Sequence, residues 1–385
     1  MYPNILRGCF YTITKLNAVN LELVIFNAMK KYLIAVVSIS FLISCKNDPI
    51  GVSTESAIQP KTFKNAVVDS ILTDSISIRG IVIDARKVWY AANNGKYGFY
   101  DLENEKIFSG HVAFDTLQPE FRSIAKTKDH VFILNAGSPA LLYKISKDGK
   151  QVRLVYKETG ARAFYDSMQF LNDNEGIAMG DPTSTCLSVI TTVDGGETWQ
   201  KHSCDGLPKV AIGEAAFAAS NSNLIVHGNG VWMVSGGKKA RVFYSADHGK
   251  KWSAFDTPIV QGSAMTGIFT ADFYDSKNGF IAGGDYEKPS LNRGNKAITS
   301  DGGRTWKLVA ENSGFGYASC VQYVPNSLAK QLVCVGASGL LYSSDSGVHW
   351  TQLLKDKGLF TIRFQNDSTA FAAGKDKLIR IRFKY

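Results

Sequence analysis

Histidine, cysteine and proline are scarce in this chain of 385 residues, which contains 6 His, 6 Cys and 10 Pro. The histidines show no paired spacing of the kind that a zinc site needs, so no metal site is predicted. No Gly-x-Gly-x-x-Gly motif lies between a strand and a helix, which argues against a dinucleotide cofactor. Lys and Arg never form a run of more than three residues, although the formal charge is +9, so no nucleic-acid partner is predicted.

The composition is that of a folded, turn-rich protein. Hydrophobic residues make up 45% of the chain, charged residues 20%, and there are 35 glycines. A largely disordered chain has too few apolar residues to match these values. Short apolar runs separated by turn residues favour an all-β fold, and the length suffices for one large repeat architecture.

An apolar segment near the N-terminus has the features of an export signal. Lys30 and Lys31 precede the apolar run Tyr32–Ile43, which is short for a membrane span but usual for a signal peptide. The run leads into L-I-S-C, which resembles a bacterial lipobox. The resemblance implies that Cys45 carries a lipid and is the first residue of the mature chain. A transmembrane helix is the alternative, and the length of the run argues against it.

These features divide the chain into four parts. Residues 1–28 are predicted to be a gene-model extension, and residues 29–44 to be a lipoprotein signal peptide. Residues 45–61 form a polar tether, and residues 62–385 form the folded domain. The Lys-Asn-Asp tract of the tether is similar to tracts that direct some Bacteroidetes lipoproteins to the cell surface. We therefore expect a bacterial cell-envelope protein, an outer-membrane lipoprotein that faces either the periplasm or the surface.

One eight-residue pattern, [S/T]-x-D-x-G-x-x-W, occurs four times in the second half of the chain. The Asp residues of these copies and of a worn fifth copy at Ser146–Gly149 are spaced about 44 to 54 residues apart, which is the period of a repeat fold. The three defining residues of the four copies are Asp194, Gly196, Trp199, Asp247, Gly249, Trp252, Asp301, Gly303, Trp306, Asp345, Gly347 and Trp350.

The pattern matches the Asp-box, or BNR repeat, of sialidases and other β-propellers. Its residue types suit a tight hairpin, because Asp bonds successive N–H groups, Gly tolerates a positive φ, and Trp covers the turn. We therefore assign the boxes a structural role. Each repeat offers four short strands with the box between the third and the fourth, which is one propeller blade.

Counting such units predicts an all-β, seven-bladed β-propeller. The seventh unit has room for only three strands. Residues 62–73 have the composition of a strand, and we expect them to pair with the last blade and close the ring, which removes the exposed edges of an open array.

The folded domain contains four cysteines. Cys186 and Cys204 each lie nine residues from Gly195, so they face each other across a symmetric hairpin and are predicted to form a disulfide. Cys320 and Cys334 fall on the first two strands of the sixth unit. The sequence is compatible with either a second disulfide between Cys320 and Cys334 or a pair of buried free thiols.

Propellers bind ligands at the mouth of the central channel, so residues at the ends of the inner strands are candidates for a binding rim. The charges among these residues have two interpretations. They form either a binding rim for an anionic or polar partner or a ring of salt bridges between blades. The candidates are Arg79, Arg122, Asp166, Asp181, Glu214, Asp285 and Tyr317.

A sialidase-like glycoside hydrolase is the enzymatic alternative, with Asp166 and Glu214 as its carboxylates. Three features argue against it: Phe121–Ile124 lacks the usual Arg-Ile-Pro arrangement, seven units exceed the six blades of sialidases, and a third rim arginine is missing. No catalytic residues are therefore predicted.

From residue 75 onward the chain resembles the photosystem II stability/assembly factor-like propellers, which also occur in Bacteroidetes. The phrases F-Y-D-S-M-Q-F, G-D-P, G-E-A-A-F-A-A-S, V-S-G-G-K and G-G-D-Y carry this resemblance. It implies a monomeric, non-catalytic binding or assembly scaffold, held at the membrane by its lipid, with a protein or glycan partner at the channel mouth. Relatives often carry labels such as oxidoreductase, which these residues do not support. A purely structural envelope component is the remaining alternative.

Overall fold

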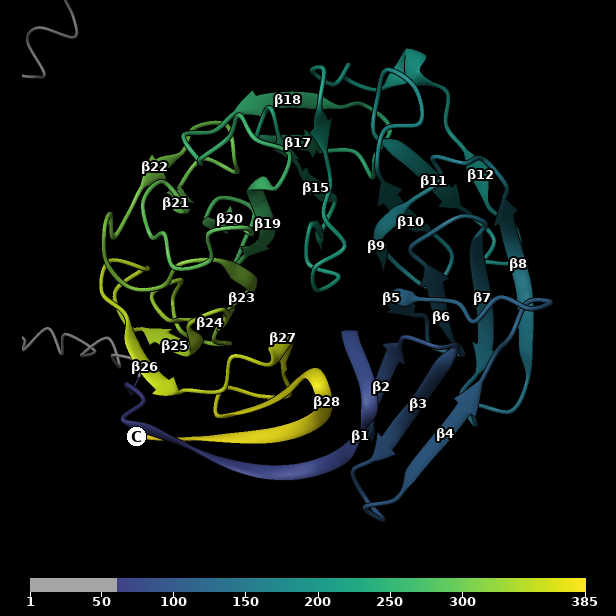
Figure 1. Cartoon of the computed structure of the whole chain (residues 1–385), viewed down its shortest axis with the longest axis horizontal. Coiled ribbons are helices and arrows are strands. Elements are labelled where there is room, and N and C mark those ends of the chain that lie inside the picture. Colours follow the sequence, from purple (N-terminus) through teal and green to yellow (C-terminus); the bar gives the residue numbers. More distant parts are fainter. Residues whose placement is uncertain (1–60) are drawn as a thin grey trace, which may run out of the picture. The chain divides into compact units, whose positions relative to one another are not determined.

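The computed structural model describes residues 61–385, which form one compact unit. The predicted signal peptide, the lipidation residue Cys45 and nearly all of the tether lie outside the described residues. Six antiparallel sheets are arranged around a ring (Figure 1). The one helix of the described part is the three-residue 3-10 turn Cys204–Gly206, and no helix there could cross a membrane.

Four of the sheets have four strands each, hydrogen-bonded in the orders β5-β6-β7-β8, β12-β11-β10-β9, β14-β15-β17-β18 and β23-β24-β25-β26. Their bounds are β5 Phe121–Lys126, β6 His130–Asn135, β7 Ala140–Ser146, β8 Val152–Glu158, β9 Tyr165–Phe170, β10 Gly176–Gly180, β11 Ser188–Thr192, β12 Gln200–Lys201, β14 Leu224–His227, β15 Gly230–Val234, β17 Arg241–Ser245, β18 Ser253–Asp256, β23 Ala318–Tyr323, β24 Leu332–Gly336, β25 Gly339–Ser343 and β26 Thr351–Leu354.

The other two sheets have six strands each, in the orders β27-β28-β1-β2-β3-β4 and β13-β16-β19-β20-β21-β22. Their bounds are β1 Asn65–Asp84, β2 Lys87–Ala92, β3 Lys96–Asp101, β4 Ile107–His111, β13 Glu214–Ala215, β16 Gly236–Gly237, β19 Thr266–Phe273, β20 Gly279–Asp285, β21 Lys296–Thr299, β22 Lys307–Leu308, β27 Leu359–Phe364 and β28 Thr369–Lys384.

The structure is therefore a six-bladed β-propeller, and the expectation of seven separate blades is wrong. The physical reason lies in β1, which is 20 residues long. Its first half pairs with β28 from Asn65↔Lys384 to Thr73↔Lys377, and its second half pairs with β2 from Ile78 to Asp84. The predicted first and seventh units thus share one continuous strand and merge into a single sheet.

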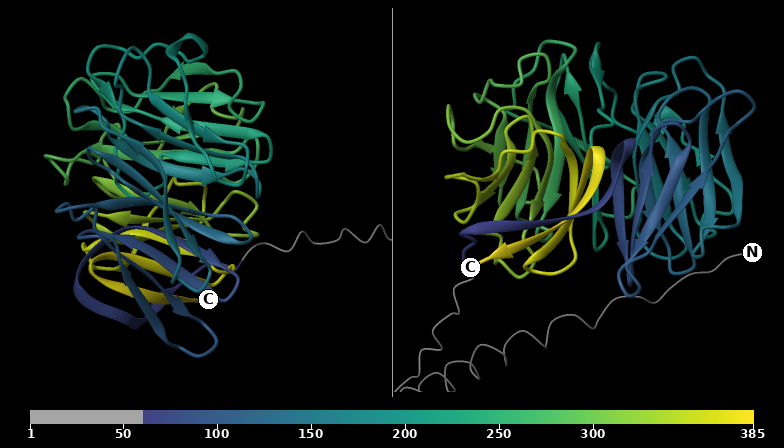
Figure 2. Two further views of the ribbon diagram at one scale, coloured as in Figure 1. Left: turned by 90° about the vertical axis from the view of Figure 1, so that its right-hand side faces the viewer. Right: turned by 60° about the horizontal axis from the view of Figure 1, so that its bottom comes forward.

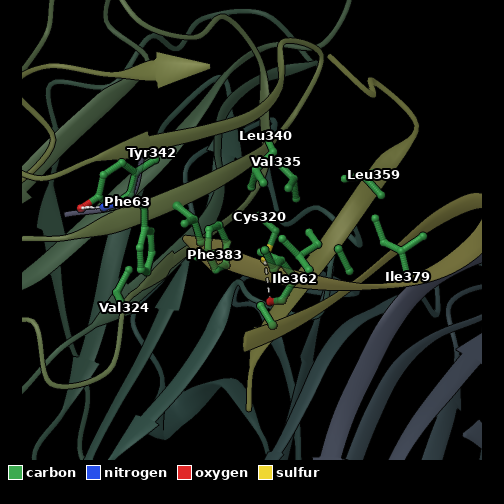
Figure 3. Close-up of a cluster of buried hydrophobic side chains, with 14 residues drawn as sticks. Phe63, Cys320, Val324, Val335, Leu340, Tyr342, Leu359, Ile362, Ile379 and Phe383 are labelled. Carbon is green, nitrogen blue, oxygen red and sulfur yellow. Dashed lines mark hydrogen bonds between the residues drawn. The ribbon is translucent and has the colours of Figure 1, made fainter. Parts of the chain in front are cut away.

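The hydrophobic core is divided into clusters between neighbouring sheets. One cluster fastens the two ends of the described chain together (Figure 3). Phe63 stacks on Phe383 at a centroid distance of 4.4 Å, lies 4.8 Å from the Tyr342 ring, and donates its N–H to the Tyr342 hydroxyl at 3.3 Å. The strands β1 and β28 run side by side next to this cluster (Figure 2). The ring is therefore closed both by the pairing of β1 with β28 and by the packing of Phe63 in this cluster.

The four [S/T]-x-D-x-G-x-x-W segments connect β11 to β12, β17 to β18, β21 to β22 and β25 to β26, which are the last two strands along the chain in each of their sheets. In one of them the Thr299 hydroxyl donates to Asp301 at 2.7 Å and accepts the N–H of Gly303 at 3.0 Å. The indole N–H of Trp306 then donates to the carbonyl of Gly303 at 2.9 Å. Gly303 has a φ of 89°, which a β-carbon would disfavour. Each residue type of the pattern serves the turn itself.

The cysteines behave in two ways. Cys186 and Cys204 form the predicted disulfide, whereas Cys320 and Cys334 are buried free thiols, which is one of the two possibilities that the sequence left open for them. Register explains the difference, because Cys320 pairs with Val335 and Cys334 with Val321. A one-residue offset places the two thiols on opposite faces of the sheet, where they pack into different clusters.

We predict that Phe63→Ala lowers the free energy of unfolding by about 3 kcal/mol, because it empties a buried aromatic site at the ring closure. Val67→Ala is the control on the same N-terminal segment, since Val67 is 41% exposed and should change stability by no more than about 0.5 kcal/mol. Equilibrium denaturant unfolding measures both. Equal, small effects would show that Phe63 does not hold the closure.

Candidate functional site

A segment of residues 216–223, which we call the crossing segment, extends across the central channel. It lies between β13 and β14 and consists mainly of Ala, Ser and Asn. Ala216, Ala218 and Ala219 are buried, as are the four polar residues that follow. Small side chains suit this position, because the inner strands of several sheets approach the segment from all around.

Polar contacts join the crossing segment to six inner strands. The Asn221 amide donates to Ile124 O on β5 at 2.7 Å and accepts the Met168 N–H of β9 at 3.0 Å. Further hydrogen bonds join Ser220 to Ser319 of β23, Ser222 to Thr270 of β19, Arg363 of β27 to the carbonyls of Ser220 and Asn221, and Arg79 of β1 to the carbonyl of Ala219.

A pocket of about 380 Å³, here the mouth pocket, opens at one end of the channel above this segment. Four of the seven predicted rim residues line it: Arg79, Arg122, Asp181 and Tyr317. They come from β1, β5, the end of β10 and the residue before β23, so different sheets contribute to one site. The other lining residues are Phe164, Ala215, Ala216, Phe217, Ala218, Ala219, Ala264, Met265, Phe269 and Tyr286.

The two arginines give the mouth pocket its charge. Arg79 is half-buried, its guanidinium lies 4.3 Å from the Phe360 ring, and its buried Nε has no hydrogen-bond partner among the described residues. Burial and the neighbouring charge of Arg122 lower the pKa of Arg79. Arg122 contacts Glu120 at 3.2 Å, and that carboxylate is 41% exposed. Two like charges in one pocket repel, so an anionic group placed between them would be stabilised.

Aromatic rings form one wall of the mouth pocket. Phe217 stacks on Phe269 at 3.9 Å, and Tyr317 meets the edges of Phe269 at 4.8 Å and Tyr286 at 5.1 Å. Sequence reasoning found Tyr317 but missed the other three. The G-E-A-A-F-A-A-S phrase held a signal for Phe217, since a run of Ala with few β-branched residues is a poor inner strand.

A buried carboxyl lies behind the pocket. Asp166 on β9 is fully buried, and neither of its oxygens has a hydrogen-bond partner among the described residues. Burial, and then the charge of Asp181, raise the pKa of Asp166 well above its usual range, although Arg122 acts in the opposite direction. Burial also raises the pKa of Asp181, which accepts the Ala216 N–H at 2.8 Å. Asp166 does not line the mouth pocket.

Glu214 and Asp285 are not brought to the mouth pocket. Glu214 is buried and pairs with Arg241, whose Nη2 lies 2.6 Å from Oε2. The sequence-based register placed Glu214 on an inner strand, but the inner strand β14 begins only at Leu224, and the crossing segment occupies the residues between. Asp285 accepts the N–H groups of Glu287 and Lys288 and thereby caps its own turn.

This geometry does not fit the glycosidase alternative. A retaining or inverting pair needs both carboxylates facing one open pocket. Asp166 is fully buried, and Glu214 is neutralised by Arg241 in a different pocket. Residues 61–385 also hold no group of three or more His, Cys, Asp or Glu side chains that could bind a metal ion.

Comparison with solved structures identifies the architecture. "YCF48 bound to D1 peptide" matches 86% of this chain and 100% of its own, with 14% identity and a TM-score of 0.60. The chain is a β-propeller that resembles YCF48. YCF48 from Cyanidioschyzon merolae covers 82% of this chain and 98% of its own, with 13% identity and a TM-score of 0.57.

The likeness to YCF48 concerns the fold, because other propellers match equally well. A streptogramin B lyase covers 84% of this chain and 100% of its own, with 13% identity and a TM-score of 0.61. No protein-family model and no curated protein matches the chain. At sequence identities this low, the activity of a structural neighbour is not assigned to this chain.

We predict that Asp166→Asn reduces the pH dependence of stability. The raised pKa means that the folded chain holds a proton that the unfolded chain releases, so wild-type stability falls as the pH rises above the ordinary carboxyl value of about 3.9. The variant has no such group. Its melting temperature should therefore exceed that of the wild type at about pH 8 and match it more closely at about pH 4.

The exposed Asp129→Asn serves as the control and should follow the wild type at both pH values. Parallel melting curves for Asp166→Asn and Asp129→Asn would contradict the assignment of a buried, protonated Asp166.

Proposed function

We propose that this chain is a non-catalytic binding or assembly scaffold of the bacterial cell envelope, and that it binds a protein partner at the mouth pocket. The observation that carries the proposal is the placement of Arg79 and Arg122 side by side in one pocket. A salt-bridge ring would put a carboxylate between such charges. Here the contact of Arg122 with the exposed Glu120 is the one ion pair of these arginines within residues 61–385.

The surroundings of the mouth pocket favour a protein over a glycan. Tyr286 is 47% exposed and Leu291 51% exposed on one loop, which is fastened to the pocket because Tyr317 donates its N–H to Pro289 O at 2.8 Å. Exposed apolar side chains around a polar site are typical of protein interfaces. The peptide complex named for YCF48 shows that a propeller of this shape can hold a polypeptide.

The envelope location rests on the sequence alone. The apolar run Tyr32–Ile43 followed by Cys45 supports export and lipidation, with the lipid holding the propeller at the outer membrane. The polar stretch of residues 45–61 is then the tether that joins the lipid to the propeller. The proposal takes the propeller to act as a monomer.

We predict that Arg122→Ala weakens partner binding about tenfold, because one charge-assisted hydrogen bond contributes about 1.5 to 3 kcal/mol. The tagged chain, cross-linked in intact cells and isolated from the envelope fraction, would be compared with the variant by quantitative mass spectrometry. Binding of the purified chain to each candidate would then be measured by calorimetry.

Arg86→Ala is the matched control, since Arg86 also contacts a single glutamate, Glu103, but lies outside the mouth pocket. A partner retained equally by Arg86→Ala and Arg122→Ala would contradict the proposed site. A loss of thermal stability in Arg122→Ala alone would support the salt-bridge ring. Retention of glycans instead of proteins would redirect the proposal to a carbohydrate ligand.

We predict that Cys45→Ser abolishes incorporation of radiolabelled palmitate and moves the chain from the membrane to the soluble fraction, because the lipid supplies the anchor. Labelling and fractionation of cells that express either form measure this. Ser44→Ala, which leaves the acceptor thiol in place, should label normally. A labelled or membrane-bound Cys45→Ser chain would contradict the lipoprotein assignment.

A further inference from the structure

A second, larger hollow joins the mouth pocket. This side pocket has a volume of about 760 Å³ and shares Phe164, Asp181, Ala215 and Ala264 with the mouth pocket. The two hollows therefore adjoin, and we call them together the groove. The groove leads from the channel mouth to the loops between β10 and β11 and between β12 and β13.

The outer wall of the groove, residues 209–213, is held in place by hydrogen bonds and a disulfide. Val210 donates its N–H to Thr185 O at 2.9 Å, and the Cys186–Cys204 disulfide joins the two loops at their bases. Glu214, paired with Arg241, accepts the Ala211 N–H at 2.7 Å. A wall fixed in this way needs no ordering when a ligand binds, which lowers the entropic cost of association.

This rigid wall presents an apolar side chain to solvent. Ile212 lines the side pocket and is 98% exposed, the highest value among the large exposed hydrophobic residues of the described chain. The crossing segment begins only four residues further on, at Ala216. Exposed Ile is unfavourable in water, so its position on a braced turn beside a hollow suits a contact with a partner.

The charge of the groove is positive along its length. Arg162 and Lys209 line the side pocket, and Arg79 and Arg122 line the mouth pocket. The lining carboxyls are Asp181, which accepts the Ala216 N–H, and Glu214, which is paired with Arg241. The groove therefore has four lining cations and two lining carboxyls, and this excess of positive charge favours an acidic ligand.

We infer that the groove binds an extended, acidic polypeptide segment. One Asp or Glu side chain of the segment meets Arg79 and Arg122, an apolar side chain packs on the aromatic wall, and the following residues lie along Ile212 and Lys209. This inference rests on the proposed function and names the ligand of that site.

Size supports a chain over a small molecule. The side pocket alone lies toward the upper end of the roughly 300–1,000 Å³ that small-molecule sites occupy, and the mouth pocket extends it further. Extended chain segments alternate their side chains between two sides, which lets one side contact the groove while the other faces solvent. The crossing segment forms the floor at the mouth, so the ligand lies over the channel and not through it.

The test uses a library of capped peptides of about ten residues, which span roughly 33 Å when extended, selected on the immobilised propeller. Selected peptides should be enriched in Asp or Glu next to an apolar residue. Ile212→Asp should weaken their binding about tenfold, since it places a charge against the acidic ligand and removes an apolar contact. Val193→Asp is the matched control, because Val193 is 76% exposed but lies in a strand-connecting turn outside both pockets.

Fluorescence anisotropy with the wild type, Ile212→Asp, Val193→Asp and Arg122→Ala separates the outcomes. Loss with Ile212→Asp and Arg122→Ala, but not with Val193→Asp, is the expected result. Loss with Arg122→Ala alone would overturn the groove and leave the mouth pocket as the binding site. Selection of no peptide would overturn the groove and count against the proposed function as well. Binding that requires a free C-terminal carboxylate would overturn the assignment of an internal acidic side chain.

Discussion

The hydrogen bonds of the crossing segment are the constraint on which the rest of the structure depends. A propeller sheet contacts only its two neighbours, so a ring of sheets has no direct link across its centre. Here Asn221 alone bonds β5 and β9, and the carbonyls of Ser220 and Asn221 bind Arg363 on β27. The segment therefore connects sheets that could otherwise shift relative to one another, and Asn221, whose buried amide is hydrogen-bonded on both sides, makes the main link.

The same segment shapes the candidate site. Because it fills the channel with small side chains, the mouth becomes a shallow pocket with an alanine floor. The arginines are then held at its edge, with Arg79 bonded to Ala219 O and lying over Phe360. Holding Arg79 and Arg122 in partly desolvated positions costs free energy, and a bound anion would offset this cost. This is the usual relation between local electrostatic strain and a binding site.

The sequence was sufficient for the repeated turns and the all-β class, and it singled out four of the residues that line the mouth pocket. Local chemistry explains this success, because an Asp-Gly-Trp turn depends on a few adjacent residues such as Thr299, Asp301 and Gly303. Long-range geometry explains the failures. The merging of the first and last units depends on the pairing of β1 with β28, a strand about three hundred residues away in the sequence. The offset between Cys320 and Cys334 depends on the register of β23 and β24, which the spacing of the cysteines does not give. Glu214 was misplaced because the crossing segment replaces the strand that the repeat period suggests.

The double pairing of β1 has a consequence for how the chain reaches its final form. Asn65 is among the first described residues and pairs with Lys384, one residue before the C-terminus. Contacts of such sequence separation form late, because the intervening chain must first be brought together. A chain delivered N-terminus first therefore keeps the edge Asn65–Thr73 open until its last residues arrive. Any form truncated at its C-terminus would leave this edge unpaired, and an unpaired edge can pair with the strands of other molecules.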